Sequence, residues 1–339
     1  MPDSLHVLVT ARFTKDHLDR LRRISPRLLL TQTIPSREME DTSPLFTGDE
    51  EVYYGMRLPY KLTVAPKLKW VQLHSAGVDH LASHPIWKSQ IKVTTSSGVH
   101  ATPIGEFAIA LMLGLARKIP RLAYLRERSE WPKDRWEQLL GVELRGKTLG
   151  IIGYGSIGRE TARIAKRGFG MRVIAMKRGT NKEDKGFREA RVGDPQGRIP
   201  EQWFDRAHLV DLLRQSDFVL LAAPFTSETH LMIGETELRS MKPTAFLINI
   251  ARGELIDEPV LVRALRDKWI AGAGLDAFAE EPLPRTSQLW HLDNVILSPH
   301  ASSATPHYDD RAVELFAENL RRYLIGEPLL NLVNESAGY

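Results

Sequence analysis

The chain has 339 residues, which is long enough for two packed domains. Its 46 basic and 42 acidic residues give a net charge of +4 that is spread along the chain, with no run of interleaved basic and aromatic residues, so a nucleic-acid-binding function is not expected. There is no cysteine, which excludes disulfides, zinc–thiolate sites and a cysteine nucleophile and is compatible with a reducing cytoplasm.

No membrane or secretory segment is evident in the sequence. Its beginning, MPDSLHVLVT, lacks the charged-then-apolar pattern of a signal peptide. The longest apolar run is residues 107–116, and its length is about half of the roughly twenty residues that a membrane span needs. We therefore expect a buried helix there, a cytoplasmic protein and no membrane partner.

Short apolar runs alternate with polar helical stretches over the first hundred residues. A strand is predicted at residues 5–11 and a helix at residues 14–24, with Thr14 as its N-cap. Further strands are predicted at RLLLTQ, EVYYGM and KWVQLH. This rhythm is typical of a parallel sheet covered by helices.

A long helix is predicted over residues 101–119, opened by Thr102 and Pro103. A second alternating region begins at KTLGIIGYGSIG, and residues 179–204 are predicted to form a surface insertion. An amphipathic helix is expected near the end of the chain, at residues 307–326. The strands of the second region are predicted at TLGIIG, RVIAM, FVLLAA, AFLINI, AGAGLDA and NVILS.

The segment GYGSIG places Gly153, Gly155 and Gly158 in the G-x-G-x-x-G spacing between a predicted strand and a predicted helix. The first glycine permits a tight turn, the second lets a pyrophosphate approach the backbone, and the third lets helix and strand pack closely. The helix N-terminus adds amide donors and positive potential. The pattern in this context predicts a dinucleotide site.

Lys177 and Arg178 stand at the end of the next predicted strand, where an NAD-binding protein usually has a carboxylate. A carboxylate would repel the 2′-phosphate of NADP, whereas these two cations would attract it. We therefore predict a preference for NADP(H), with NAD(H) as a possible cofactor. The alternative is that both residues are solvated cations at the start of a surface loop.

Three predicted strands are followed by ionisable residues. Arg252 follows AFLINI, Asp276 and Glu281 follow AGAG, and His300 follows NVILS. Because ligands gather at the carboxyl ends of parallel strands, these side chains can converge near a nicotinamide. His80 and His84 have the spacing of a metal pair, but without a third ligand nearby no metal is expected.

These segments resemble the D-isomer-specific 2-hydroxyacid dehydrogenase family. The similarity is carried by GYGSIG, by FVLLAAPFTSETHLMIGETELRSMKPTAFLINIARGELIDEPVL, and by AGAGLDAFAEEPLP and SPHASSAT. The segment SAGVDHL at residues 75–81 also resembles the substrate loop of the family. The insertion at 179–204 and the missing acid at 177 depart from the family pattern.

The resemblance implies a mechanism. Arg252 would grip a 2-oxoacid, His300 would protonate its carbonyl oxygen as hydride arrives, and Glu281 would orient the imidazole and favour its protonated form. Asp276 would hold the nicotinamide carboxamide. The substrate carboxylate would be bound by the backbone of Ser75, Ala76, Gly77 and Val78, and the cofactor by Gly153, Gly155, Ser156, Ile157, Gly158, Lys177, Arg178, Ala223, Pro224, Thr229, Ile250 and Asp276.

The resemblance also implies an α/β fold of two parallel-sheet domains, Rossmann-like and flavodoxin-like, with a cleft between them. Residues 1–100 and 305–339 would form the substrate-binding domain, and residues 101–304 the dinucleotide-binding domain. The expected reaction is reduction of a small 2-oxoacid, such as glyoxylate or hydroxypyruvate, to a D-2-hydroxyacid by NAD(P)H.

Two rival functions share this fold. In formate dehydrogenases a glutamine replaces the glutamate partner of the histidine, so Glu281 argues against that activity. A nucleotide-sensing corepressor would keep the fold and even the catalytic residues, and it remains the alternative to an enzyme. Trp131 and Trp136 lie where family members extend a helical arm around a second subunit, so a homodimer is expected, with packing inside one chain as the alternative for either residue.

Overall fold

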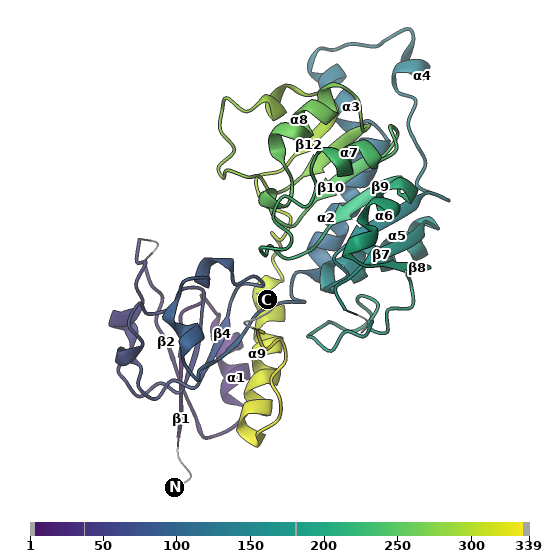
Figure 1. Cartoon of the computed structure of the whole chain (residues 1–339). Coiled ribbons are helices and arrows are strands. Elements are labelled where there is room, and N and C mark those ends of the chain that lie inside the picture. The colour runs from purple at the N-terminus through teal and green to yellow at the C-terminus, as the bar shows by residue number, and fades with distance from the viewer. Residues whose placement is uncertain (1–3, 37, 180–181, 335–339) are drawn as a thin grey trace. The chain divides into compact units, whose positions relative to one another are not determined.

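The computed structural model describes residues 4–36, 38–179 and 182–334. The chain divides into two compact units (Figure 1). Unit 1 comprises Met1–Val99, Lys185–Glu189 and Thr305–Tyr339, and unit 2 comprises His100–Asp184 and Ala190–Ala304. Each unit contains one parallel sheet, which confirms the α/β fold of two parallel-sheet domains expected from the sequence.

The sheet of unit 1 has five parallel strands in the order β2-β1-β3-β4-β5, which is the flavodoxin-like order. Helices α1 and α9 cover one face, and irregular segments cover the other. The predicted Thr14 cap is confirmed, since its hydroxyl accepts a hydrogen bond from the His17 amide. The elements are β1 Leu5–Val9, α1 Lys15–Arg22, β2 Leu28–Gln32, β3 Val52–Gly55, β4 Trp70–Leu73, β5 Lys92–Thr94 and α9 Tyr308–Ile325.

The sheet of unit 2 has seven parallel strands in the order β12-β11-β10-β9-β6-β7-β8, so the strand order reverses between β6 and β9, as in Rossmann folds. Its strands are β6 Thr148–Ile152, β7 Arg172–Met176, β8 Gln202–Phe204, β9 Phe218–Leu221, β10 Phe246–Asn249, β11 Gly272–Leu275 and β12 Val295–Leu297. Its helices are α2 Ala101–Ala116, α3 Ile119–Glu127, α4 Arg135–Gln138, α5 Ser156–Phe169, α6 Leu209–Gln215, α7 Glu235–Ser240 and α8 Glu258–Arg266.

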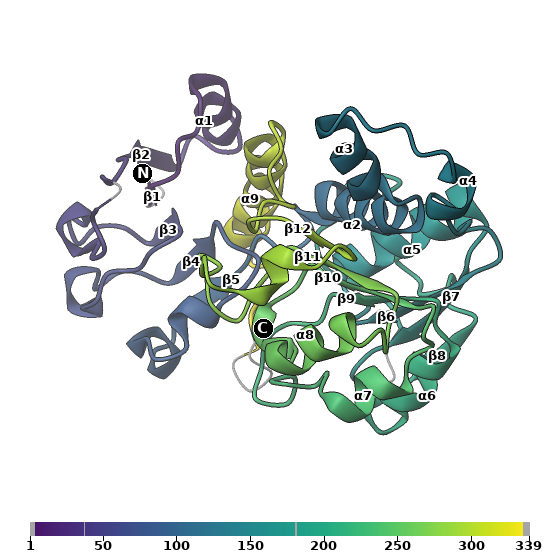
Figure 2. The same ribbon diagram turned by 90° about the horizontal axis from the view of Figure 1, so that it is seen from above.

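Helices cover both faces of the unit 2 sheet, and Figure 2 shows α2 and α5 on one side with α6, α7 and α8 on the other. Successive strand residues point to opposite faces, so Ile151 packs beneath α2 and α5 while Ile152 packs toward α6. This two-sided burial explains why the strands of the sequence are short, almost continuous apolar runs.

The helix expected at 101–119 is shorter than predicted. Helix α2 begins at Ala101 after His100 and has no side-chain cap, so Thr102 lies inside the first turn. The chain leaves the helix after Ala116, and Lys118 adopts a left-handed conformation with φ 53°. Pro120 then lies in the first turn of α3, where its missing amide costs nothing, so a second helix starts here.

The surface insertion predicted at residues 179–204 is confirmed for most of its described residues, which are exposed or half-buried, but some of its side chains are buried. Phe187 is buried in an apolar cluster of unit 1, and Asp194 is buried in unit 2, where its carboxylate accepts a hydrogen bond from the Tyr154 hydroxyl. Strand β8 also lies in this segment, while residues 180 and 181 fall outside the described chain. The polar composition of this segment does not predict the burial of Phe187 and Asp194, because the residues that cover them are distant in the sequence.

Strands β5 and β8 were not predicted, because three residues are too few for a periodic pattern to emerge. Among the described residues, no helix is both long enough and apolar enough to cross a membrane.

Candidate active site

Three neighbouring strands of unit 2 end in the predicted catalytic segments. Strands β10, β11 and β12 are parallel, with Asn249 paired to Leu275 and Leu275 paired to Leu297. Arg252, Asp276 and His300 follow these strand ends within three residues. The structure therefore brings all three segments to the carboxyl edge of one sheet, where parallel α/β folds bind ligands.

His300 and Glu281 form a hydrogen-bonded pair. The Nδ1 atom of His300 lies 2.8 Å from Oε2 of Glu281, and the other carboxylate oxygen accepts a hydrogen bond of 3.0 Å from the Phe278 amide. Both side chains remain partly exposed. His300 has a positive φ of 53°, a conformation that costs free energy in a residue other than glycine. The surrounding loop thus holds the imidazole with Nδ1 toward the carboxylate.

Arg252 is held by its backbone. The Asn249 side chain donates a hydrogen bond of 2.9 Å to the Arg252 carbonyl and accepts one of 3.0 Å from the Ala251 amide. The next residue, Gly253, lies against the neighbouring loop, because a Cβ atom there would be 1.8 Å from the carbonyl carbon of Phe278. Only glycine permits this approach, which carries the Arg252 segment to the loop of Glu281.

Asn249 and Gly253 were not singled out from the sequence. A polar residue inside an apolar strand and a glycine directly after a predicted catalytic arginine are the signals that could have found them. Both act on the placement of Arg252, so both belong to the site in a supporting role.

Asp276 is 1 % exposed, and its carboxylate is already engaged. Its oxygens accept hydrogen bonds from the Ser298 hydroxyl at 2.6 Å, the Ala301 amide at 2.8 Å and the Ser302 amide at 3.1 Å. These three donors flank His300 on both sides. In this structure the carboxylate of Asp276 therefore fastens the histidine loop to the end of β11.

The glycine-rich turn has the shape that a pyrophosphate requires. Gly153 has φ 98°, and a Cβ atom there would lie 2.4 Å from the Ala223 amide. A Cβ atom on Gly158 would lie 2.5 Å from the Gly153 carbonyl oxygen, so this glycine lets α5 pack on the turn. At Gly155, by contrast, no atom of the described residues lies within 4 Å of the Cβ position. Space is thus left where the sequence pattern places a phosphate, in front of α5.

Ser156 and Ile157 open α5, where the first backbone amides of a helix have no partner inside it. The described residues thus offer the donors and the space that a dinucleotide needs. The other predicted cofactor residues lie at adjacent strand ends. Ala223, Pro224 and Thr229 follow β9, with the Thr229 hydroxyl donating to the Pro224 carbonyl at 2.7 Å, and the buried Ile250 follows β10.

Lys177 and Arg178 follow β7 directly, and β7 is the neighbour of β6 in the sheet. Lys177 is half-buried, and burial together with the nearby Arg159 guanidinium lowers the pKa of its ammonium group below the usual value. Arg178 is exposed, and its guanidinium lies 3.5 Å from the carboxylate of Glu228. The two cations therefore follow the strand next to the one that leads into the glycine-rich turn.

The predicted carboxylate loop lies in unit 1, directly after β4. Among the described residues, the backbone amides of Ser75, Ala76, Gly77 and Val78 donate no hydrogen bond. The loop is instead fixed through other atoms: the Ser75 carbonyl accepts from the Ser96 amide at 2.8 Å, and the Ser75 hydroxyl donates to the Gly77 carbonyl at 2.8 Å. Four donors are thereby left for an anion.

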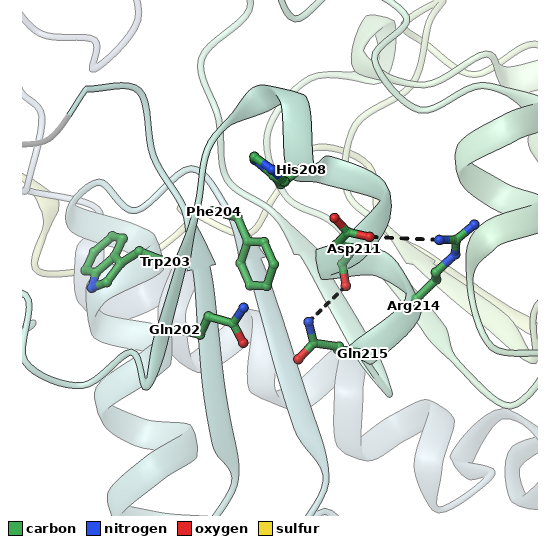
Figure 3. Close-up of a pocket in the computed structure, with 7 residues that line it drawn as sticks. All are labelled: Gln202, Trp203, Phe204, His208, Asp211, Arg214 and Gln215. Carbon is green, nitrogen blue, oxygen red and sulfur yellow. Dashed lines mark hydrogen bonds and ion pairs between the residues drawn. The ribbon is translucent and has the colours of Figure 1, made fainter.

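A surface hollow of about 520 Å³ lies elsewhere in unit 2, between β8 and α6 (Figure 3). Three of its polar residues are paired with one another: Asp211 lies 3.9 Å from Arg214, and the Gln215 amide donates to the Asp211 carbonyl. None of the predicted site residues lines it. The hollow is also lined by Gln202, Trp203, Phe204 and His208. Across the described chain, no group of three potential metal ligands is found.

Comparison with known proteins agrees with this geometry. Residues 109–302 match the family model described as D-isomer specific 2-hydroxyacid dehydrogenase, NAD binding domain. A glyoxylate reductase of Thermococcus litoralis is 41 % identical over 275 residues, which cover 80 % of this chain and 78 % of the relative. A glyoxylate reductase of Korarchaeum cryptofilum is 40 % identical over 274 residues, covering 80 % of this chain and 77 % of the relative.

Solved structures share the fold over almost the whole chain. The TT0316 protein from Thermus thermophilus is 31 % identical with a TM-score of 0.73, over 97 % of this chain and 100 % of that one. A D-isomer specific 2-hydroxyacid dehydrogenase from Xanthobacter autotrophicus, solved in complex with NADPH and MES, is 27 % identical with a TM-score of 0.77, over 99 % and 100 %. The chain belongs to the D-isomer specific 2-hydroxyacid dehydrogenase family, and it is an oxidoreductase that reduces 2-oxoacids with a nicotinamide cofactor.

Proposed function

We propose that this enzyme reduces glyoxylate or a similarly small 2-oxoacid to the corresponding D-2-hydroxyacid, with NADPH as the preferred cofactor. The observation that carries the proposal is the pairing of His300 with Glu281 at the strand edge that also presents Arg252. The substrate class is supported by the two glyoxylate reductases that are 40 % and 41 % identical to this chain.

In the proposed reaction the nicotinamide supplies the hydride to the carbonyl carbon of the 2-oxoacid. His300 delivers the proton to the carbonyl oxygen, and because Nδ1 faces Glu281, Nε2 is the donating atom. Glu281 orients the imidazole through its contact with Nδ1. The Arg252 guanidinium polarises the carbonyl and holds the substrate, and the amides of residues 75–78 bind its carboxylate.

The NADPH preference rests on Lys177 and Arg178, which follow β7 next to the strand of the glycine-rich turn. A structurally similar dehydrogenase, 27 % identical to this chain, was solved with NADPH. Hydrogen bonds to charged groups contribute about 1.5–3 kcal/mol each, so a single such bond would shift the cofactor ratio by roughly ten- to 150-fold. Asp276 is proposed to hold the nicotinamide carboxamide in addition to fastening the His300 loop.

We also propose a homodimer that forms through the segment from α3 to α4. Trp131 and Trp136 are 83 % and 79 % exposed within one chain, so packing inside the chain does not account for either. Large apolar side chains at such exposure mark interaction surfaces when they gather. Ile119, Leu122, Tyr124 and Leu140 of the same segment are exposed as well.

The function is tested by assaying a panel of 2-oxoacids with NADPH and NADH in parallel. We expect NADPH oxidation with glyoxylate or hydroxypyruvate. His300→Ala should lower kcat about 10²–10⁴-fold, because a general acid contributes a factor of this size, while the dissociation constant for NADPH changes little. Absence of turnover with every 2-oxoacid would contradict the proposal and favour a nucleotide-sensing role, and near-normal turnover by the variant would contradict the acid role of His300.

A further inference from the structure

The first turn of α9 contacts the end of β4 inside unit 1. The Tyr308 hydroxyl donates a hydrogen bond to the backbone carbonyl of His74, and the two rings meet edge-on at 4.6 Å between centroids. The next helix residue, Asp309, places Oδ1 3.9 Å from Nε2 of the same imidazole. Two successive residues of α9 therefore engage both the backbone and the ring of His74.

The opposite side of the imidazole is held by β3. The Tyr54 hydroxyl lies 2.8 Å from Nδ1 of His74, and the two ring centroids are 5.6 Å apart. The His74 amide donates to the Gly55 carbonyl at 2.9 Å. We call Tyr54, His74, Tyr308 and Asp309 the His74 cluster. Together with the Gly55 contact, the cluster engages the amide, the carbonyl and both ring nitrogens of His74.

Burial raises the pKa of both tyrosines in this cluster. Their hydroxyls therefore keep their protons at every pH at which an enzyme assay is run. The Tyr308 hydroxyl is thus a permanent donor to the His74 carbonyl. Burial also raises the pKa of the Asp309 carboxyl group. The contact between Asp309 and His74 therefore depends more on pH than the contacts of the two tyrosines do.

His74 is the residue immediately before the loop 75–78. The amide plane that joins His74 to Ser75 carries both the carbonyl bound by Tyr308 and the first loop amide, and peptide planarity makes them move together. The next plane is fixed through the Ser75 carbonyl by Ser96. Rotation of the first two loop amides is therefore opposed by the Tyr308 contact on one side and the Ser96 contact on the other.

We propose that Tyr308 is a positioning residue for the substrate carboxylate: through His74 it fixes the direction in which the amides of residues 75–78 point. Tyr54 and Asp309 also help to fix the position of His74, because both contact its ring. The inference rests on the proposed function, because it takes this loop as the carboxylate site. The proposal gives the amino-terminal turn of α9 a role in substrate binding. The sequence alone predicted only an amphipathic helix there.

Tyr308→Phe tests the proposal, because it removes one hydroxyl and keeps the ring. Loss of this hydrogen bond predicts a rise of about two- to thirteenfold in the KM for the 2-oxoacid. The dissociation constant for NADPH should stay unchanged, and kcat should change less than KM. Tyr54→Phe removes the hydroxyl contact with the His74 ring and leaves the Tyr308 contact with the His74 carbonyl in place, so it should raise the same KM by a smaller factor.

Tyr323→Phe is the matched control. Tyr323 lies on the same helix in the same unit, and its hydroxyl also makes a hydrogen bond, of 2.7 Å, but to Glu51. This variant should leave the KM for the 2-oxoacid unchanged. Thermal unfolding of all variants checks that each is folded. An unchanged KM in Tyr308→Phe, or an equal rise in Tyr323→Phe, would overturn the proposal while the proposed function stands.

A second measurement tests the positioning role of Tyr308 separately from the proposed reductase function. Calorimetric titration of oxalate, a planar dicarboxylate that cannot be reduced, reports anion binding to the NADPH-loaded enzyme without turnover. If the wild-type protein fails to reduce any 2-oxoacid but binds oxalate, the proposed function fails, and weaker oxalate binding by Tyr308→Phe still supports the positioning role. If oxalate does not bind to the wild type, the loop is not a carboxylate site and the positioning role is refuted.

Discussion

The environment of Lys177 in the folded protein destabilises the charged form of its ammonium group. Burial and the neighbouring Arg159 lower the pKa of its ammonium group below the usual value. The unfolded chain then binds the proton more tightly than the folded chain, so stability is reduced at neutral pH and recovers as the pH rises toward the pKa of the unfolded group. We propose that a bound 2′-phosphate adds negative charge to that of the nearby Asp184 carboxylate and so gives this unfavourable placement a functional reason.

Lys177→Met should therefore raise the melting temperature of the cofactor-free protein at neutral pH. The same variant should raise the KM for NADPH at least about tenfold more than the KM for NADH, because a charge-assisted bond to the phosphate is lost. Scanning calorimetry and steady-state kinetics check the two parts. Arg178→Met is the stability control, since this exposed side chain should leave the melting temperature unaltered. Equal losses for both cofactors would contradict phosphate binding.

The placement of Arg252 depends on an approach between two loops at the end of neighbouring strands. Residues 253 and 278 are in backbone contact, with less space than a methyl group needs. The same edge of the sheet is tied by Asp276 to the loop of His300. The proposed catalytic groups thus lie on three separate loops whose positions are set by backbone packing and buried hydrogen bonds at the strand ends.

Gly253→Ala should separate these loops. The added methyl group would meet backbone atoms of Phe278 and Ala279 that cannot rotate away, and overpacking of this kind typically costs about 1–3 kcal/mol. We expect a loss of stability and a lower kcat/KM for the 2-oxoacid, measured by urea unfolding and kinetics. Gly168→Ala is the control, because no atom of the described residues lies near its Cβ position on α5. Unaltered kinetics in Gly253→Ala would show that Arg252 does not need this approach.

At the scale of the whole molecule, the segment from α3 to α4 carries large apolar side chains that its own unit leaves in water. Figure 1 shows α4 within a long excursion of the chain in unit 2. Arg135 stacks on the ring of Trp136 at 5.4 Å, which shields one face of the indole and leaves the side chain 79 % exposed. Burial of these side chains against a second copy would remove them from water.

The double variant Trp131→Ser, Trp136→Ser should therefore run as a monomer of 38.4 kDa in sedimentation experiments, whereas the wild type should have twice that mass. The hydrophobic gain from burying two indoles is lost, and polar side chains in their place do not restore it. Trp290→Ser is the matched control, since Trp290 is 52 % exposed and lies outside the segment. A monomeric wild type would refute the dimer, and a dimeric double variant would move its interface elsewhere.

The α/β class, most strands and the glycine-rich turn could be predicted from the amino-acid sequence, because these depend on local properties: short apolar runs, a capping residue such as Thr14, and glycine spacing. Resemblance to the family added the roles proposed for Arg252, Asp276, Glu281 and His300 and the carboxylate loop at residues 75–78. Helix ends were predicted less exactly, as Pro120 illustrates, since a single residue can divide an apolar run that otherwise looks continuous.

The tertiary structure alone decided which distant residues meet. Contact of Glu281 with His300, burial of Asp276 by the His300 loop, insertion of Phe187 into the apolar cluster of unit 1 and the approach of Tyr308 to His74 all join segments that are remote in sequence or separated by loops. Local periodicity carries no information about such pairs, because their geometry follows from sheet order and from packing of loops at strand ends.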